Sequence, residues 1–321
     1  MYFTGWNGTV KQESRTFDIY AMAYAQFYAQ SENVQGYSPD PTALAKIKEK
    51  QNFDSGYDFT IVESLVYGED LRPGPQNIGN CVGYSHCMLL ASKIAHEIFV
   101  ELQPEKPLAT NTPIPYIPYS YGAGRVYVGG NRYWGDGSNC ADQIQASMEH
   151  GFLPCDTPDL TGPFPQSTSS IGRQFGKSRS TLDKFHDTAI NFDLVESTRI
   201  TSIDEIRRFL TEVYSPLQIC SSWGFRPSYY DNNRGIWIYK ASGRWSHSMQ
   251  LVGWISIKGE EFIHVRNQWG RDAHKNSTPV IPLGGFLISP DTMKSWLRSA
   301  YCASIGEIKG KAREKLKKFP F

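Results

Sequence analysis

The sequence lacks the features that mark membrane, metal-binding or nucleic-acid-binding proteins. No apolar run approaches the roughly 20 residues that a membrane helix needs, and residues 1–18 lack the order of a signal peptide. No CxxC pair or histidine-rich tract accompanies the cysteines, so we expect no metal and no cofactor. The net charge of +1 excludes a strongly basic nucleic-acid binder. We therefore expect no membrane or nucleic-acid partner, and a location inside the cell or in an assembled particle rather than classical secretion.

Cysteine is also scarce, with six residues in a chain of 321. That number is too small for a scaffold held together by disulfides. Reduced thiols are therefore the expectation for all six. A disulfide between Cys140 and Cys155 remains an alternative in an oxidising compartment.

The hydrophobic pattern predicts a helical half followed by a half rich in strands. Helical spacing is found in the segments 16–31, 41–50, 79–102, 140–152 and 202–213, whereas 110–139 and 156–185 are expected to be loops. After residue 216, short segments rich in β-branched and aromatic residues alternate with polar or glycine turns. This order is typical of an α+β protein, in which a cleft between the two halves is a common place for a site.

The stretch QNIGNCVGYS, residues 76–85, places Cys81 at the start of the long predicted helix 79–102. A free thiol has a pKa of about 8.5, so little of it is nucleophilic at neutral pH. A helix N-terminus and a nearby imidazolium both stabilise the thiolate. Cys81 is therefore a candidate nucleophile, whereas Cys87, further along the same helix, is expected in the core.

Two later motifs supply the groups that such a nucleophile needs. His247 opens the predicted strand SHSMQLVGW, and Asn267 ends the next one in HVRNQWG. The histidine can act as the general acid and base, and an amide can hold its ring in one orientation. Trp269 is placed to cover the bond between these two side chains and exclude water. His86 and His96 are expected on the surface of the long helix.

Seven ordered segments resemble the papain family of cysteine peptidases over roughly residues 60–290. They are QNIGNCVGYS, CADQIQASMEHGF, SPLQICSSW, RGIWIYK, SHSMQLVGW, VRNQWG and GGFLIS. The resemblance implies a two-lobed α+β fold, with a helical lobe over about 60–200 and an antiparallel β lobe or barrel over about 201–300. It leaves 1–59 as an extension and 301–321 as a basic tail, and either is a candidate docking segment for a protein partner.

The resemblance also assigns roles to individual residues. It implies that Cys81, His247 and Asn267 are catalytic and that Gln76, with the Cys81 backbone N–H, stabilises the oxyanion. Gly137, Cys220, Ser248 and Trp269 match positions beside a bound peptide substrate.

Several departures from the family pattern are visible in the sequence. Gln76 stands five residues before Cys81 where the family has six, so either the turn is one residue shorter, or Asn77 or a backbone donor shares the role of Gln76. His247 follows Cys81 by 166 residues, against an interval of about 130–150 in the family. The two expected loop regions accommodate that excess at small cost.

The sequence therefore predicts a cysteine hydrolase acting on peptide bonds in a peptide or protein. Two alternatives stay open, an amidase acting on cell-wall peptides and a non-catalytic papain-like module of a larger assembly.

Overall fold

The computed structural model describes residues 39–68, 75–104, 114–160, 168–270, 272–275, 281–282, 284–298 and 300–306. The predicted helix over 16–31 and the basic stretch 309–318 lie outside these residues. Of the two proposed docking segments, residues 1–38 and 307–321 lie outside them as well. Among the described residues, no helix combines the length and apolarity that crossing a membrane requires.

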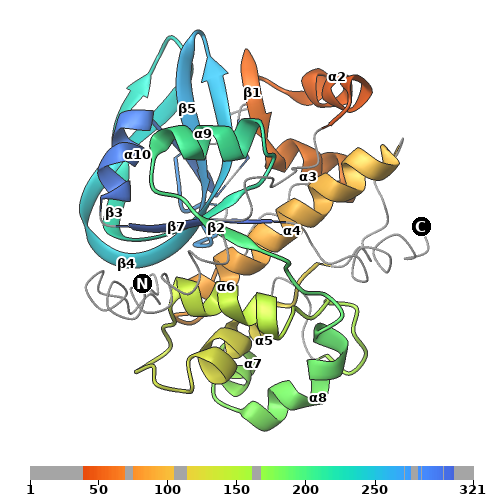
Figure 1. Cartoon of the computed structure of the whole chain (residues 1–321). Helices are drawn as coiled ribbons and strands as arrows, with labels where there is room; N and C mark the ends of the chain where they lie inside the picture. Colours follow the sequence, from red (N-terminus) through yellow and green to blue (C-terminus); the bar gives the residue numbers. More distant parts are fainter. Residues whose placement is uncertain are drawn as a thin grey trace.

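The helices are grouped around one long central element. They are α2 (Pro41–Lys50), α3 (Phe59–Tyr67), α4 (Cys81–Leu102), α5 (Ile117–Ala123), the π-helix η1 (Gly124–Val128), α6 (Cys140–Glu149), α7 (Ser169–Phe175), α8 (Arg179–Ala189), α9 (Ile203–Thr211) and α10 (Pro290–Leu297). Figure 1 shows α4 running between the sheet on one side and α5 to α8 on the other. This arrangement places the N-terminal end of α4 where the two parts meet.

The strands form one seven-stranded sheet. They are β1 (Ser55–Asp58), β2 (Ser197–Arg199), β3 (Leu217–Asp231), β4 (Ile236–Ile257), β5 (Glu260–Arg266), β6 (Gly285–Ile288) and β7 (Ala300–Ile305). The order is β2-β7-β3-β4-β5-β6, with β1 on β4, and every pair is antiparallel except β4 with β6. The predicted α+β class is confirmed, but the sheet stays open and does not close into a barrel.

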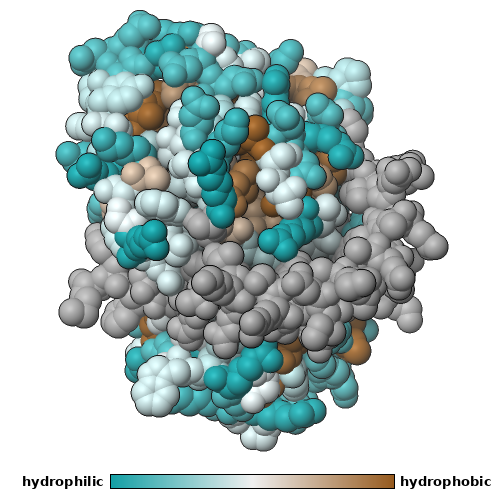
Figure 2. All heavy atoms as spheres, turned by 60° about the vertical axis from the view of Figure 1, so that its left-hand side comes forward, coloured by the Kyte–Doolittle hydropathy of each residue, from teal (hydrophilic) through white to brown (hydrophobic). Residues whose placement is uncertain are grey.

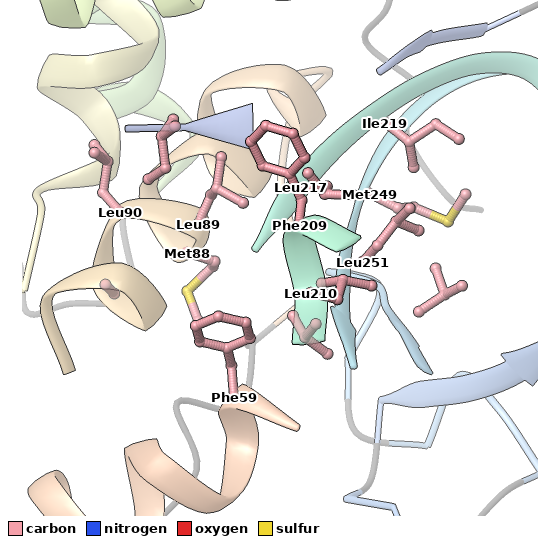
Figure 3. Packing of buried hydrophobic residues seen from close by; sticks show 14 of the residues in the cluster. Phe59, Met88, Leu89, Leu90, Phe209, Leu210, Leu217, Ile219, Met249 and Leu251 are labelled. Atoms are coloured by element: carbon pink, nitrogen blue, oxygen red, sulfur yellow. The ribbon is translucent and has the colours of Figure 1, made fainter. Parts of the chain in front are cut away.

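A buried apolar cluster joins α4 to the sheet. The labelled side chains in Figure 3 come from α3 and α4 on one side and from α9, β3 and β4 on the other: Phe59, Met88, Leu89, Leu90, Phe209, Leu210, Leu217, Ile219, Met249 and Leu251. Burial of this size is the main favourable term in folding. It fixes α4, and with it Cys81, against the strands that carry the other predicted site residues.

The predicted helices at 41–50, 79–102, 140–152 and 202–213 are confirmed as α2, α4, α6 and α9. In α9 the capping box is complete, because Ser202 accepts from the Glu205 N–H and the Glu205 side chain accepts from the Ser202 N–H.

The face of the molecule in Figure 2 is mostly hydrophilic over the described residues, with hydrophobic residues in small areas between them.

The expectation of loops at 110–139 and 156–185 is wrong, because both regions contain helices. In α5, Pro118 lies in the first turn, where a missing N–H costs nothing, and Tyr119 and Tyr121 are fully buried. Tertiary burial outweighs the Pro- and Gly-rich composition there. In α7 and α8, the side chains of Thr168 and Ser178 cap the first turn.

The contact of α5 with α4 depends on a glycine close to Cys81. A Cβ placed on Gly83 would lie 2.7 Å from both Cα and Cβ of Tyr121. The helical part can therefore approach the start of α4 only because residue 83 has no side chain.

Candidate active site

Cys81 is the first residue of α4 and is fully buried. The first hydrogen bond into the helix is donated by the Tyr84 N–H to the Asn80 carbonyl oxygen at 2.9 Å. The N–H groups of the preceding helical residues therefore point out from the helix end, where they favour negative charge. This is the setting that a thiolate needs.

His247 lies in β4 opposite Ser221 of β3 and is 1% exposed. Its Nε2 is 2.8 Å from Oδ1 of Asn267, which follows β5. The indole of Trp269 lies over this pair, with its ring centroid 4.6 Å from that of His247. The structure thus brings together three of the residues that the sequence assigns to the site.

The backbone around Asn267 defines the orientation of its amide. The Gln268 N–H, which can only donate, lies 2.8 Å from Asn267 Oδ1. Oδ1 is therefore the atom that faces His247, and His247 must donate through Nε2–H. Its other nitrogen, Nδ1, then carries the lone pair, and among the described residues this buried atom has no hydrogen-bond partner.

Gln268 connects the nucleophile and histidine segments, and the sequence-based assignment missed it. Its Nε2 donates to the carbonyl oxygens of Cys81 at 3.2 Å and Ser248 at 2.6 Å. One amide nitrogen thus holds the start of α4 beside the residue that follows His247. The available signal was glutamine at the position of serine in the Asn-Ser-Trp-Gly motif of the papain family.

Gln76 lies beside the same segment, since its N–H donates to the Gln268 carbonyl oxygen at 2.9 Å. Its side-chain Nε2 donates to the Ile78 carbonyl oxygen at 3.0 Å, within its own turn. Its role toward an oxyanion stays a prediction.

The structure places the predicted substrate-side residues Cys220 and Ser248 in the buried interior, close to Cys81. Cys220 forms a disulfide with Cys140 across 80 residues. The Ser248 hydroxyl is fully buried and lies 2.6 Å from that of Ser85 and 3.1 Å from Nε2 of Gln218. Both side chains are fully buried, as Cys81 is, and a substrate-side role for them stays a prediction.

Gly137 is also buried, and its carbonyl oxygen accepts from the guanidinium of Arg125. The same guanidinium donates to the carbonyl oxygens of Gly135 at 2.9 Å and Gly176 at 3.0 Å. Arg125 therefore holds the loop before α6 in place. A substrate-binding role for Gly137 stays a prediction.

The disulfide corrects both expectations about the cysteines. The expectation of reduced thiols is wrong for Cys140 and Cys220. The alternative disulfide between Cys140 and Cys155 is also wrong, because Cys155 packs with a separate apolar cluster. The start of α6 faces β3, so Cys140 meets Cys220 beside Cys81. The bond joins the helical part to the sheet.

Removing this disulfide should destabilise the protein. Closing a loop of this length restricts the unfolded chain by about 4 kcal/mol in the chain-entropy account. We expect the double variant Cys140→Ala, Cys220→Ala to lose about 2–5 kcal/mol of unfolding free energy, measured by denaturant titration. Mass spectrometry of protein alkylated without reduction checks the bond itself. Two alkylated thiols at these positions in the native protein would contradict the assignment.

The prediction that His86 and His96 lie on the helix surface is wrong, since both are fully buried. His86 contacts Oε1 of Gln218 at 3.3 Å and the Ser147 hydroxyl at 2.7 Å. Burial lowers the pKa of His86 to about 4 and that of His96 well below its usual value. Both imidazoles are therefore neutral at physiological pH and pack among the apolar residues of α4.

Acid should destabilise the fold through His86. Burial lowers the pKa of His86 to about 4, against 6.5 in an unfolded chain. The unfolded state therefore binds more protons, and stability is lost as pH falls from about 6.5 to about 4, by up to about 3 kcal/mol. Denaturant titrations over this range measure the slope. His86→Asn replaces the imidazole with an amide that does not titrate, so it should flatten the dependence of stability on pH. An unchanged slope would contradict the role of His86.

The described part of the chain holds no group of three His, Cys, Asp or Glu side chains able to bind a metal ion. Burial lowers the pKa of His247, while the hydrogen bond with Asn267 raises it.

Comparison with solved structures identifies the architecture. Xylellain, a cysteine protease from Xylella fastidiosa, is 18% identical, with a TM-score of 0.52 over 85% of this chain and 91% of its own. The chain has a papain-like fold. The procathepsin B structure from Trypanosoma congolense is 10% identical, with a TM-score of 0.48 over 87% of this chain and 84% of its own. No family model matches the sequence, and no curated protein matches it significantly.

Within the papain-like fold, the long interval between Cys81 and His247 has a structural explanation. The segments that were expected to absorb the excess contain α5, η1, α7 and α8. They pack as a second apolar cluster that includes Tyr116, Tyr119 and Phe175. The additional chain length is therefore built into the helical part rather than left as surface loops.

Proposed function

We propose that this protein is a divergent papain-like cysteine hydrolase that cleaves peptide bonds through Cys81, His247 and Asn267. The observation that carries the proposal is the fixed orientation of His247. Asn267 accepts from Nε2–H, and the buried Nδ1 is left with a lone pair. This tautomer is the one that can take a proton from a thiol, and Gln268 holds the Cys81 segment close by.

The reaction would begin with transfer of the Cys81 proton to Nδ1 of His247. The sulfur attacks the carbonyl carbon, and the resulting oxyanion is stabilised by the Cys81 N–H and by Gln76. His247 returns its proton to the amine nitrogen as the C–N bond breaks, leaving a thioester on Cys81. Water then attacks the thioester, its proton passes to His247, and the carboxylic acid and the thiol are released.

The cover of Trp269 supports this chemistry. The indole is 8% exposed and also contacts Trp245, with ring centroids 5.3 Å apart. Trp269, backed by Trp245, excludes water from the bond between His247 and Asn267. In a medium of low dielectric constant that bond is stronger, which keeps the imidazole in one orientation while its charge changes.

The test is covalent labelling with an epoxide probe selective for papain-type thiolates, on folded protein under mild reducing conditions. Wild type should be labelled at Cys81, and Cys81→Ala should not be labelled. Cys87→Ala is the matched control, because burial raises the pKa of the Cys87 thiol to about 12 and keeps it protonated. A folded wild type without label would overturn the proposal and favour the non-catalytic module.

A further inference from the structure

A second histidine lies on the far side of Asn267. Nε2 of His274 is 3.0 Å from Nδ2 of Asn267, and His274 is 8% exposed. Asn267 therefore bridges two imidazoles, with Oδ1 toward His247 and Nδ2 toward His274. Its backbone is fixed separately, because the Asn267 N–H donates to the Gly284 carbonyl oxygen at 3.1 Å.

The hydrogen-bond directions in this chain of side chains follow from one backbone group. The Gln268 N–H requires Oδ1 of Asn267 on its side, which leaves the NH₂ group facing His274. Because that group only donates, His274 must accept through an unprotonated Nε2 and carry its proton on Nδ1. Burial and the neighbouring His247 lower the pKa of His274 to about 3, so the ring is neutral and able to accept at physiological pH.

Aromatic side chains hold the His274 ring in place. Its centroid lies 4.8 Å from that of Phe286 and 5.3 Å from that of Phe225, and it stacks on Trp269 at 6.5 Å. The next residue is fixed as well, because the Lys275 N–H donates to the Tyr239 hydroxyl at 2.9 Å. A packed ring with one acceptor directed at the asparagine is suited to orienting it.

We propose that His274 is a positioning residue, which holds the Asn267 amide in the orientation that fixes the tautomer of His247. Without the acceptor, a buried NH₂ group would be left unsatisfied. The amide would then gain by rotating, and Oδ1 would leave the His247 N–H. The inference rests on the proposed function, since it assigns His274 a role in the reactivity of Cys81.

Two variants separate the acceptor from the packing. His274→Phe keeps an aromatic ring among Phe225, Phe286 and Trp269 but has no acceptor, whereas His274→Gln places an oxygen near the position of Nε2. We expect His274→Phe to lower the rate of Cys81 labelling by the epoxide about tenfold, the usual effect of losing a buried hydrogen bond. His274→Gln should recover most of that rate.

Tyr239→Phe is the matched control for loosening of the segment. It removes the hydroxyl that holds Lys275 and leaves the His274 acceptor in place. A labelling rate within about twofold of wild type is expected, because this bond does not reach Asn267. An equal loss in Tyr239→Phe and His274→Phe would show that only the packing matters and would overturn the inference.

The tautomers provide a readout that does not depend on catalysis. In protein labelled with ¹⁵N-histidine, NMR at neutral pH should show His274 protonated on Nδ1 only and His247 protonated on Nε2. In His274→Phe, the His247 signal should shift toward a mixture of tautomers. A proton on Nε2 of His274, or an unchanged His247 signal in the variant, would overturn the inference.

The outcomes also separate this inference from the proposed function. A labelled wild type with an unaffected His274→Phe removes the role of His274 and leaves the hydrolase intact. A folded wild type that is never labelled removes both.

Discussion

Replacing Cys81 with alanine should lower peptide hydrolysis by about four orders of magnitude or more, because no other group in the site can form the thioester. His247→Ala should cause a loss of similar size, since in the proposed mechanism the thiol passes its proton to this imidazole. The double variant should be no slower than either single variant, because groups that act as a unit are not additive. Release of fluorescent peptides from labelled casein measures all three.

Cys87→Ala is the control for this series. Cys87 is fully buried in the same helix and packs in the central apolar cluster, so its loss affects stability rather than chemistry. We expect turnover within about threefold of wild type, because a core cysteine at some distance from the reacting atoms behaves as a small hydrophobic residue. Equal losses from Cys81→Ala and Cys87→Ala would show that folding, not catalysis, is being measured.

Breaking the buried ion pair between Glu63 and Arg266 should cost about 3–5 kcal/mol of unfolding free energy. The guanidinium lies 2.7 Å from each carboxylate oxygen of Glu63, and both side chains are almost completely buried. Ser92 adds bonds to both partners, and Gln250 accepts from the guanidinium at 3.0 Å. Removing one partner leaves the charge of the other unpaired in the core.

This ion pair joins α3, α4 and β5, and Arg266 directly precedes Asn267. Glu63→Gln should therefore weaken the fold and also disturb the residue that orients His247. Denaturant titration measures the first effect, and Cys81 labelling in the remaining folded protein measures the second. Replacing both partners with methionine should recover most of the stability, because no buried charge is then left unpaired.

The exposed pair of Arg207 and Glu261 is the control, with its atoms 3.2 Å apart and both side chains well exposed. Glu261→Gln should cost less than about 1 kcal/mol, as surface ion pairs do. Equal costs at the two sites would contradict the view that burial makes the Glu63 pair important.

The proposed nucleophile, base and orienting amide can be selected from the sequence because each lies in a short motif with a local meaning. Cys81 is marked by the start of a long apolar helix; His247 lies within β4 rather than at the start of a strand, and Asn267 directly follows β5. Glycine, proline and capping residues mark the ends of these segments in the sequence. The helices α2, α4, α6 and α9 follow from the same local signals.

The rest depends on contacts that no local pattern marks. His274 follows Asn267 by seven residues in an irregular stretch without periodicity, so nothing in the sequence indicates that its ring turns back to the asparagine. The partner of Cys140 cannot be deduced from spacing, since six cysteines allow 15 connectivities. In α5, buried tyrosines stabilise a helix where the composition favours a loop. Burial of His86 and His96 likewise depends on what packs against both sides of α4.

The pH dependence of Cys81 alkylation by iodoacetamide tests the central claim most directly. Burial raises the pKa of Cys87, Cys155 and Cys302, so peptide mass spectrometry follows Cys81 against unreactive internal controls. We predict that Cys81 reacts well below the free-thiol pKa of about 8.5 and that His247→Ala removes this low-pH reactivity. A single titration near the free-thiol value, unchanged in His247→Ala, would contradict a coupled Cys81–His247 pair.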